Sequence, residues 1–214
     1  VWFESNEFIW YSEKDNWGHL YIYDLKTKKL KNQITKGNWL VRSMRHIDPL
    51  TREIFFTAGG KEKGNPYHVY FYKVNFDGSD LTCLTPEFGT HTINASPNWN
   101  YFVTTYSTTT SPPISVLKNR NGDKLAELAS ANITELEKNQ WQKPIEFSVK
   151  ARDNKTDLFG IMYVPSYYSE NDKYPVLNYI YPGPQSGSVG NYSFNVARRD
   201  YQALAELGFV VVSV

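Results

Sequence analysis

The sequence predicts a mixed fold, in which a partial β-propeller built from all-β blades is followed by the beginning of an α/β domain. The first observation behind this prediction is the aromatic content of 16%, with 16 Tyr, 12 Phe and 6 Trp in 214 residues, because aromatic side chains fit the half-buried face of a sheet. The second is a strand pattern that repeats at intervals of 46 to 49 residues. The third is a change of pattern after Leu128, where apolar runs and a helical segment appear.

Composition excludes several classes of protein. The 23 Lys and Arg nearly balance the 22 Asp and Glu, which argues against a strongly basic nucleic-acid binder or a polybasic membrane segment. An apolar content of 41% is enough to bury a core, so a disordered chain is excluded. We expect neither a signal peptide nor a membrane span, because the longest apolar run, Leu207–Val214, is too short to cross a bilayer. The single cysteine, Cys83, excludes an intramolecular disulfide and a Cys-built metal site.

The first half of the chain alternates short strands with turns. Two dipeptides, Asp77-Gly78 and Asn121-Gly122, are typical of two-residue hairpin turns. No segment in this half keeps a helical period of apolar residues for three turns. The runs rich in aromatic and β-branched residues, which we predict to be strands, are Glu7–Ser12, His19–Asp24, Glu53–Thr57 and His68–Lys73.

The strand pattern repeats. Glu7-Phe8-Ile9 returns as Glu53-Ile54-Phe55, and a third copy begins at Tyr101-Phe102-Val103. A period in the forties, with about four short strands in each copy, is typical of β-propeller blades. Because two or three blades cannot close a ring, residues 1–130 are predicted to hold only part of a propeller.

After Leu128 the pattern changes. Residues 131–143 are predicted to be a linker or short helix that ends at Pro144. Residues 144–214 follow the order strand, loop, helix, strand, which is the beginning of a doubly wound α/β domain. We expect both strands of this unit to be buried, since near-continuous apolar runs are typical of strands covered on both faces. The predicted elements are a hairpin of Glu146–Lys150 with Leu158–Val164, a strand at Tyr174–Tyr181, a loop at Pro182–Gly190, a helix at Ala197–Leu207 that stops at Gly208, and a strand at Phe209–Val214.

Two groups of residues resemble a known family. Tyr11–Tyr21 and Leu81–Pro86 resemble the late propeller blades of the prolyl oligopeptidase family, and most closely its dipeptidyl peptidase IV branch. Tyr174–Leu177, followed by Tyr181-Pro182-Gly183-Pro184-Gln185-Ser186, resembles the opening of the α/β-hydrolase domain of that family. The resemblance is collinear from Phe8 to Val214, with one departure at Pro182, where the family more often has Gly or Ala.

The resemblance implies a serine exopeptidase. The parent protein would release dipeptides that end in Pro or Ala from peptide amino termini, and would use no cofactor or metal. The Ser, acid and His of the triad are expected downstream of Val214. No Gly-x-Ser-x-Gly elbow occurs in this chain, and all four histidines lie in the first half. The 214-residue chain alone is therefore expected to be inactive.

Tyr181 is the one catalytic residue that the resemblance assigns to this chain. In the family a tyrosine at this place stabilises the oxyanion, and a positioned phenol can donate a hydrogen bond to that group. The alternative is that Tyr181 ends a buried strand and bonds the backbone. The substrate-binding residues are not identified, since the acidic pair that the family uses to hold a substrate amino terminus would precede Val1.

The remaining candidates fit structural roles. The histidines His19, His46, His68 and His91 lie among aromatic strands at no metal-ligand spacing and are predicted to pack or hydrogen-bond. The tryptophans Trp10, Trp17, Trp39 and Trp99 are predicted to pack within the blades. Asn-x-Ser/Thr sequons occur by chance in a chain rich in Asn, and are found at Asn94, Asn132, Asn154 and Asn191.

Other functions stay open at the level of sequence. An oligopeptidase or acylaminoacyl peptidase would share the fold, and a homologue without a triad would be a binding protein. The segment after Pro144 argues against a free-standing propeller module. The expected partner is a peptide substrate, not nucleic acid or a membrane. The resemblance further implies a periplasmic or extracellular parent that can form a homodimer.

Overall fold

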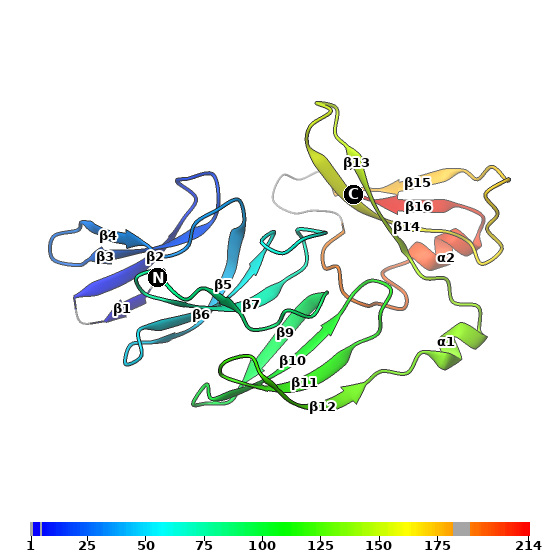
Figure 1. Ribbon diagram of the computed structural model, residues 1–214. Coiled ribbons are helices and arrows are strands. Elements are labelled where there is room, and N and C mark those ends of the chain that lie inside the picture. Colours follow the sequence, from blue (N-terminus) through cyan, green and yellow to red (C-terminus); the bar gives the residue numbers. More distant parts are fainter. Residues whose placement is uncertain (1, 5, 182–188) are drawn as a thin grey trace. The chain divides into compact units, whose positions relative to one another are not determined.

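The computed structural model describes residues 2–4, 6–181 and 189–214, with side-chain surroundings from residue 6 onward (Figure 1). The chain forms two compact units. The first comprises Val1–Thr105 with Ser115–Leu128, and the second comprises Tyr106–Ile114 with Ala129–Val214. None of the helices in the described ranges is long and apolar enough to cross a membrane.

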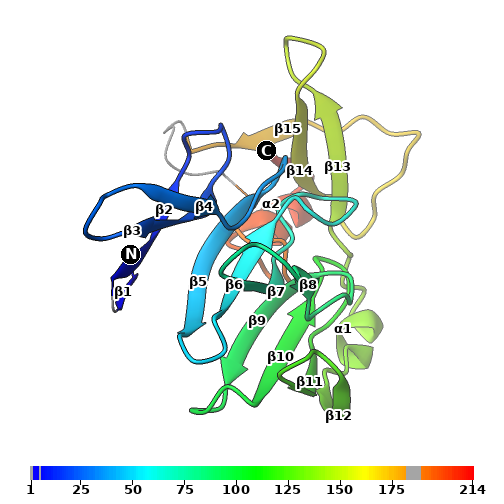
Figure 2. The same ribbon diagram turned by 60° about the vertical axis from the view of Figure 1, so that its left-hand side comes forward.

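Three four-stranded sheets follow one another in the first 130 residues, and in each the strands lie in sequence order (Figures 1 and 2). The first sheet contains β1 (Trp2–Glu4), β2 (Glu7–Ser12), β3 (His19–Asp24) and β4 (Leu30–Gln33). The second contains β5 (Leu40–Asp48), β6 (Glu53–Gly59), β7 (Tyr70–Asn75) and β8 (Thr82–Cys83). The third contains β9 (Thr90–Ala95), β10 (Tyr101–Ser107), β11 (Ile114–Asn119) and β12 (Lys124–Ser130).

These sheets are the predicted propeller blades. Each blade has four strands, and β2, β6 and β10 begin at Glu7, Glu53 and Tyr101, as the sequence repeat indicates. The two predicted hairpin glycines both have left-handed φ angles, 88° at Gly78 and 89° at Gly122. A Cβ atom at Gly122 would also lie 2.9 Å from the Leu84 carbonyl oxygen. Glycine is therefore needed at this turn for both its φ angle and its close approach to the preceding blade.

The blades are held together by apolar faces that meet between neighbouring sheets. In β6, Phe56 packs in a cluster shared with the first blade, whereas Phe55 packs in a cluster shared with the third blade. Successive residues of a strand point to opposite faces, so one strand can contribute to two cores. Both rings are at most 1% exposed. Full burial of such a side chain contributes about 1.5–3 kcal/mol.

After the third blade, the second unit contains a helix and a hairpin. The short helix α1 (Thr134–Lys138) lies in the predicted linker. It is followed by β13 (Ile145–Lys150) and β14 (Asp157–Tyr163), which pair antiparallel as predicted. The turn between them is organised by the Asp153 carboxylate, which accepts hydrogen bonds from the backbone N–H groups of Lys155 and Thr156, both at 2.9 Å.

A βαβ unit completes the described part of this sheet. It consists of β15 (Val176–Tyr179), α2 (Tyr201–Glu206) and β16 (Val210–Ser213). The strand order is β13-β14-β16-β15, with β15 parallel and β14 antiparallel to β16. The predicted start of an α/β domain is confirmed. Its core is formed by apolar residues of β14, β16 and α2 with Val189 and Tyr192.

Three details of the sequence prediction are wrong: the burial of two strands and the start of a helix. The strand at Tyr174–Tyr181 is not buried on both faces. Val176 is 63% exposed because β15 is an edge strand of the described sheet, and only Leu177 of this strand packs against the core. The predicted helix at Ala197–Leu207 begins only at Tyr201, because Arg199 has a φ of 50°, which a right-handed helix cannot contain.

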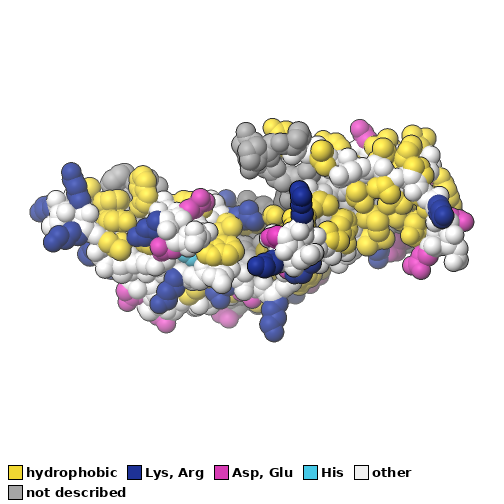
Figure 3. Space-filling view, turned by 90° about the horizontal axis from the view of Figure 1, so that it is seen from above, with side chains coloured by type: hydrophobic (Ala, Val, Ile, Leu, Met, Phe, Trp, Pro, Cys, Tyr) yellow, Lys and Arg dark blue, Asp and Glu magenta, His cyan; other side chains and the backbone are white. Residues whose placement is uncertain are grey.

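The exposed apolar side chains of the second unit are numerous, and Figure 3 shows hydrophobic surface gathered on its right-hand side. The strand predicted at Phe209–Val214 alternates between buried and half-buried residues instead of being buried throughout. Large apolar side chains that remain exposed in this unit include Val149, Val176, Ile180 and Leu207.

Candidate functional site

Tyr181 lies two residues beyond the carboxyl end of β15, the strand that leads into it. The carboxyl end of the parallel neighbour β16 is beside it, since Tyr179 of β15 is in register with Ser213 of β16. Ligands of open α/β sheets bind beyond the carboxyl ends of the strands. The Tyr181 residue is 56% exposed at this edge.

A row of tyrosines supports the end of β15. The ring of Tyr179 lies 5.1 Å from that of Tyr201 in α2, which in turn lies 5.4 Å from that of Tyr163 in β14. Tyr163 and Tyr201 are each 2% exposed, and burial raises the pKa of Tyr163. The strand that leads to Tyr181 is thereby fixed to the core through three rings in contact, one pair edge-to-face and the other tilted.

Two arginines hold the backbone near this edge. Arg198 donates hydrogen bonds to the carbonyl oxygens of Val189, at 2.8 Å, and Ser193, at 2.9 Å. Arg199 lies over the Tyr179 ring, 4.6 Å from its centre, and also donates to the Tyr179 hydroxyl. The predicted loop Pro182–Gly190 is described only at Val189 and Gly190; Gly183 and Pro184 lie outside the described residues.

Sequence patterns did not indicate Arg198 and Arg199 as members of this site. One signal was present, because two cations lie just before Asp200, the N-cap of α2, at the end of a helix where positive charge is unfavourable. Ser213 is a further member. Its buried hydroxyl has no hydrogen-bond partner among the described residues, and it lies at the carboxyl end of β16.

The model of the "Dipeptidyl peptidase IV (DPP IV) N-terminal region" matches residues 1–113. This is more than half of the chain. The chain belongs to the dipeptidyl peptidase IV family.

Relatives that match most of the chain are also named as dipeptidyl peptidases. The chain is 32% identical to the probable dipeptidyl-aminopeptidase B of Emericella nidulans, with 85% of this chain and 20% of the relative covered. It is 28% identical to dipeptidyl peptidase 8 of Homo sapiens, with 99% of this chain and 27% of the relative covered. The chain therefore spans between about a fifth and about a quarter of these relatives' length.

A solved structure shares the fold. The crystal structure of Porphyromonas gingivalis dipeptidyl peptidase 4 superposes on this chain with a TM-score of 0.79 at 24% identity. The aligned region covers 98% of this chain and 29% of the chain in that crystal structure. The predicted combination of propeller blades with the start of an α/β-hydrolase domain is confirmed by this similarity.

The histidines of this family member have the structural roles that the sequence predicts. His91 is 4% exposed; its Nε2 lies 2.7 Å from the Glu87 carbonyl oxygen and its Nδ1 lies 3.0 Å from the Thr104 hydroxyl. A carbonyl oxygen can only accept, so Nε2 donates and Nδ1 accepts in the neutral ring. His19 has the same arrangement, with Gly37 and Thr35 as its partners.

Burial lowers the pKa of His91 to about 4, although the carbonyl of Glu87 acts in the opposite direction. The neutral ring is therefore the stable form in the fold. His46 is stacked on Trp99 with ring centres 4.5 Å apart. Within the described residues, no group of three or more His, Cys, Asp or Glu side chains is arranged to hold a metal ion.

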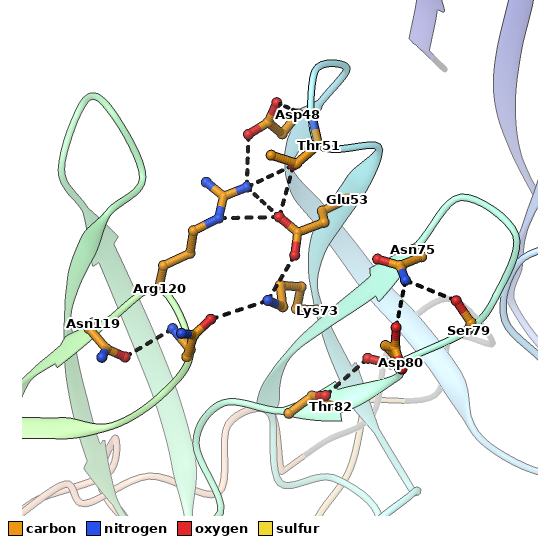
Figure 4. Close-up of polar contacts among 11 residues, drawn as sticks. Asp48, Thr51, Glu53, Lys73, Asn75, Ser79, Asp80, Thr82, Asn119 and Arg120 are labelled. Atoms are coloured by element: carbon orange, nitrogen blue, oxygen red, sulfur yellow. Dashed lines mark hydrogen bonds and ion pairs between the residues drawn. The ribbon is translucent and has the colours of Figure 1, made fainter.

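An ion network joins the second and third blades (Figure 4). Arg120, in the β11–β12 turn, contacts the carboxylates of Asp48 at 2.8 Å and Glu53 at 2.6 Å. Lys73 contacts Glu53 from the other side at 2.8 Å. Burial alone would raise the pKa of Glu53, but the hydrogen bonds from Lys73 and Arg120 outweigh it and hold that pKa below its ordinary value. The positive and negative charges of this network compensate one another within the fold. The network is therefore a structural feature of the propeller.

Proposed function

We propose that the full-length protein of which this chain is a part is a serine-type dipeptidyl peptidase that releases X-Pro or X-Ala dipeptides from peptide amino termini. The proposal is supported by membership of the dipeptidyl peptidase IV family. The observation that carries it is the position of Tyr181, exposed at the carboxyl end of β15 in a βαβ unit that follows the blades.

The role proposed for Tyr181 is to stabilise the oxyanion. When a serine attacks the scissile carbonyl, negative charge develops on its oxygen, and the phenol O–H of Tyr181 donates a hydrogen bond to it. A preorganised donor of this kind contributes about 3–4 kcal/mol to transition-state stabilisation. The row of Tyr179, Tyr201 and Tyr163 gives the preorganisation, because these ring contacts fix the strand before the reaction begins.

The nucleophile, acid and base are proposed to lie outside this chain. The histidines within it belong to the blades, where His19, His68 and His91 are at most 4% exposed. A histidine buried inside a blade cannot accept a proton from a serine in another domain. We therefore propose that the 214-residue chain alone has no peptidase activity.

The test is hydrolysis of a Gly-Pro anilide by the full-length protein. Tyr181→Phe is expected to lower kcat by about a hundredfold or more, because it removes only the donated hydrogen bond. Tyr167→Phe is the matched control: this tyrosine is in the same unit and is 59% exposed, compared with 56% for Tyr181. The control is expected to retain the activity of the wild type.

The outcomes separate the alternatives. A full-length protein that ignores the anilide but cleaves blocked or longer peptides would be an oligopeptidase or acylaminoacyl peptidase. A protein that cleaves none of these would be a binding homologue. Activity in the 214-residue chain would contradict the placement of the triad outside it.

A further inference from the structure

Two arginines on β5 occupy β-bulges. In the pairing of β5 with β6, Val41 lies opposite Ala58 and Ser43 lies opposite Thr57, so Arg42 between them has no partner residue. Arg45 is skipped in the same way between Met44 and His46. A bulge redirects the side chain of the extra residue, and bulges are frequent beside functional sites. Both arginines are exposed, and they are about 10 Å apart along the strand at roughly 3.3 Å a residue.

The strand that carries them is at the inner edge of its blade. Blades of a propeller surround a central channel, and one edge of each sheet faces it. In the third blade the last strand, β12, is exposed at every residue, as expected at the outer rim. The first strands, β5 and β9, form the opposite edges of their sheets. Arg42 and Arg45 therefore lie on the inner edge of the second blade.

A hollow of about 360 Å³ opens between these inner strands. It is lined by Met44 and Arg45 of β5, by Ile93, Asn94 and Ala95 of β9, and by Trp99. Arg45 reaches across it and donates to the Ile93 carbonyl oxygen at 3.3 Å. The hollow thus has a wall of mixed polar and apolar atoms, with a guanidinium at its edge.

Trp99 forms the aromatic part of this wall and is held in an unusual conformation. Its φ is 56°, a left-handed value that is rare for a bulky residue. Its ring stacks on His46, with the planes 6° apart. Bulky residues in left-handed conformations persist where the surrounding structure enforces them, and they cluster at functional sites.

Arg42 and Arg45 form no ion pair within the described residues, unlike the other two arginines of the first 128 residues. Four arginines lie in the first 128 residues. Arg52 pairs with Glu7, and Arg120 pairs with Asp48 and Glu53. Neither Arg42 nor Arg45 has a carboxylate within 4.0 Å among the residues that the structure describes. The hydroxyl of Tyr11, near Arg42, is instead bonded to Glu13 at 3.2 Å.

We propose that Arg42 and Arg45, with the adjoining hollow, bind an acidic segment of the peptide substrate. The two guanidinium groups would contact carboxylates of the peptide, and a neighbouring side chain of the peptide would occupy the hollow. Guanidinium is suited to this role because its planar donors match a carboxylate. The inference rests on the proposed peptidase function and adds to it a preference for acidic peptides.

The experiment compares two heptapeptides that share a Gly-Pro start. One carries two glutamates after the first three residues, and the other carries glutamines in their place. The full-length wild type is expected to have the higher kcat/KM with the acidic peptide at 50 mM salt. In the double variant Arg42→Gln/Arg45→Gln this preference is expected to fall about tenfold, at roughly threefold for each exposed charge pair. It is also expected to weaken in the wild type at 500 mM salt.

Two control variants are compared with the double variant Arg42→Gln/Arg45→Gln. Arg152→Gln/Lys155→Gln removes two exposed charges from the β13–β14 turn and is expected to leave the preference intact. Arg42→Lys/Arg45→Lys keeps the charge but not the planar donors and is expected to retain part of the preference, which separates charge recognition from misfolding. The Gly-Pro anilide, which carries no acidic residue, is expected to be turned over at the wild-type rate by all variants.

Each outcome decides one question. Equal kcat/KM for the two peptides in the wild type, or an unchanged preference in the double Gln variant, would overturn the acidic site. If the anilide is not hydrolysed, the peptidase function fails, and fluorescence anisotropy of the labelled heptapeptides decides the site separately. Tighter binding of the acidic peptide that is lost in the double Gln variant would support it, and equal binding of both peptides would overturn it.

Discussion

Strand β6 of the second blade and strand β15 of the α/β unit are both apolar, yet their surroundings are opposite. β6 has neighbours on both sides in its sheet and apolar cores on both of its faces, and residues Ile54–Ala58 are nearly all completely buried. β15 has one neighbour in the described sheet, and three of its four residues are exposed. An apolar run therefore identifies a strand, while its burial depends on which elements lie beside it.

The largest expected effect concerns the buried side of this comparison. Phe56 is completely buried and packs against both Trp39, at 6.2 Å, and Tyr72, at 5.6 Å, which also contact each other. Phe56→Ala is expected to lower the free energy of unfolding by about 3–5 kcal/mol, because it leaves a cavity in a packed core. Urea denaturation, with hydrogen exchange of the β6 amides as the local readout, measures it. A loss below about 1 kcal/mol would mean that the core between the blades collapses around the cavity.

The next effect concerns the network around Arg120. Arg120→Met is expected to cost about 1–3 kcal/mol, because Asp48 and Glu53 are largely buried and lose a bonding partner. Lys124→Met is the control, since its pair with Glu127 is half exposed and is expected to contribute under about 1 kcal/mol. Thermal unfolding of the full-length variants compares them. Equal shifts would show that the network adds nothing beyond a surface ion pair.

The network also has a pH signature. The pKa values of Asp48 and Glu53 are both below their ordinary values of 3.8 and 4.5. The unfolded chain binds protons first as the pH falls, so the stability that these groups add is complete above about pH 4.5 and is lost below it. Arg120→Met is expected to weaken this acid dependence, measured as the slope of unfolding free energy against pH between pH 3 and 4.5.

A smaller pH effect on stability comes from His91, and it occurs at higher pH than the effect of Asp48 and Glu53. Its folded pKa of about 4 lies below its ordinary value of 6.5. The unfolded chain therefore takes up this proton at a higher pH than the folded chain does. The stability from the neutral ring is complete above pH 6.5 and is lost as the pH falls towards 4. His91→Asn is expected to flatten the fall in Tm between pH 6.5 and 5, and an unchanged fall would assign it to other groups.

The sequence predicted those features of the fold that depend on local residue patterns. The strands expected at Glu7–Ser12 and His19–Asp24 coincide with β2 and β3, because aromatic runs between turn residues are local signals. The start of α2 was missed because the left-handed φ of Arg199 interrupts the helical backbone. The apolar residues around it keep their helical spacing in the sequence, so the pattern gives no sign of the interruption. The exposure of Val176 was missed because it depends on the order of strands in the sheet.

The candidate sites divide in the same way. Tyr181 was assigned through a resemblance of its loop, and its catalytic role stays a prediction. The same holds for the homodimer and the compartment of the full-length protein. Arg42 and Arg45 could not be assigned from sequence. They are distinguished by the register between β5 and β6, and that register depends on residues of both strands.

The smallest expected effect on stability is at the exposed side of the comparison. Val176→Lys on β15 is expected to change the free energy of unfolding by less than about 0.5 kcal/mol, because the side chain is already in water. The exposed backbone of an apolar edge strand can pair with another chain, and a lysine there opposes such pairing. The variant is therefore expected to reduce self-association of the 214-residue chain, measured by light scattering. Leu50→Lys is the control, since Leu50 is 94% exposed but lies in a turn. If both variants reduced scattering equally, general hydrophobicity and not the strand edge would be the cause.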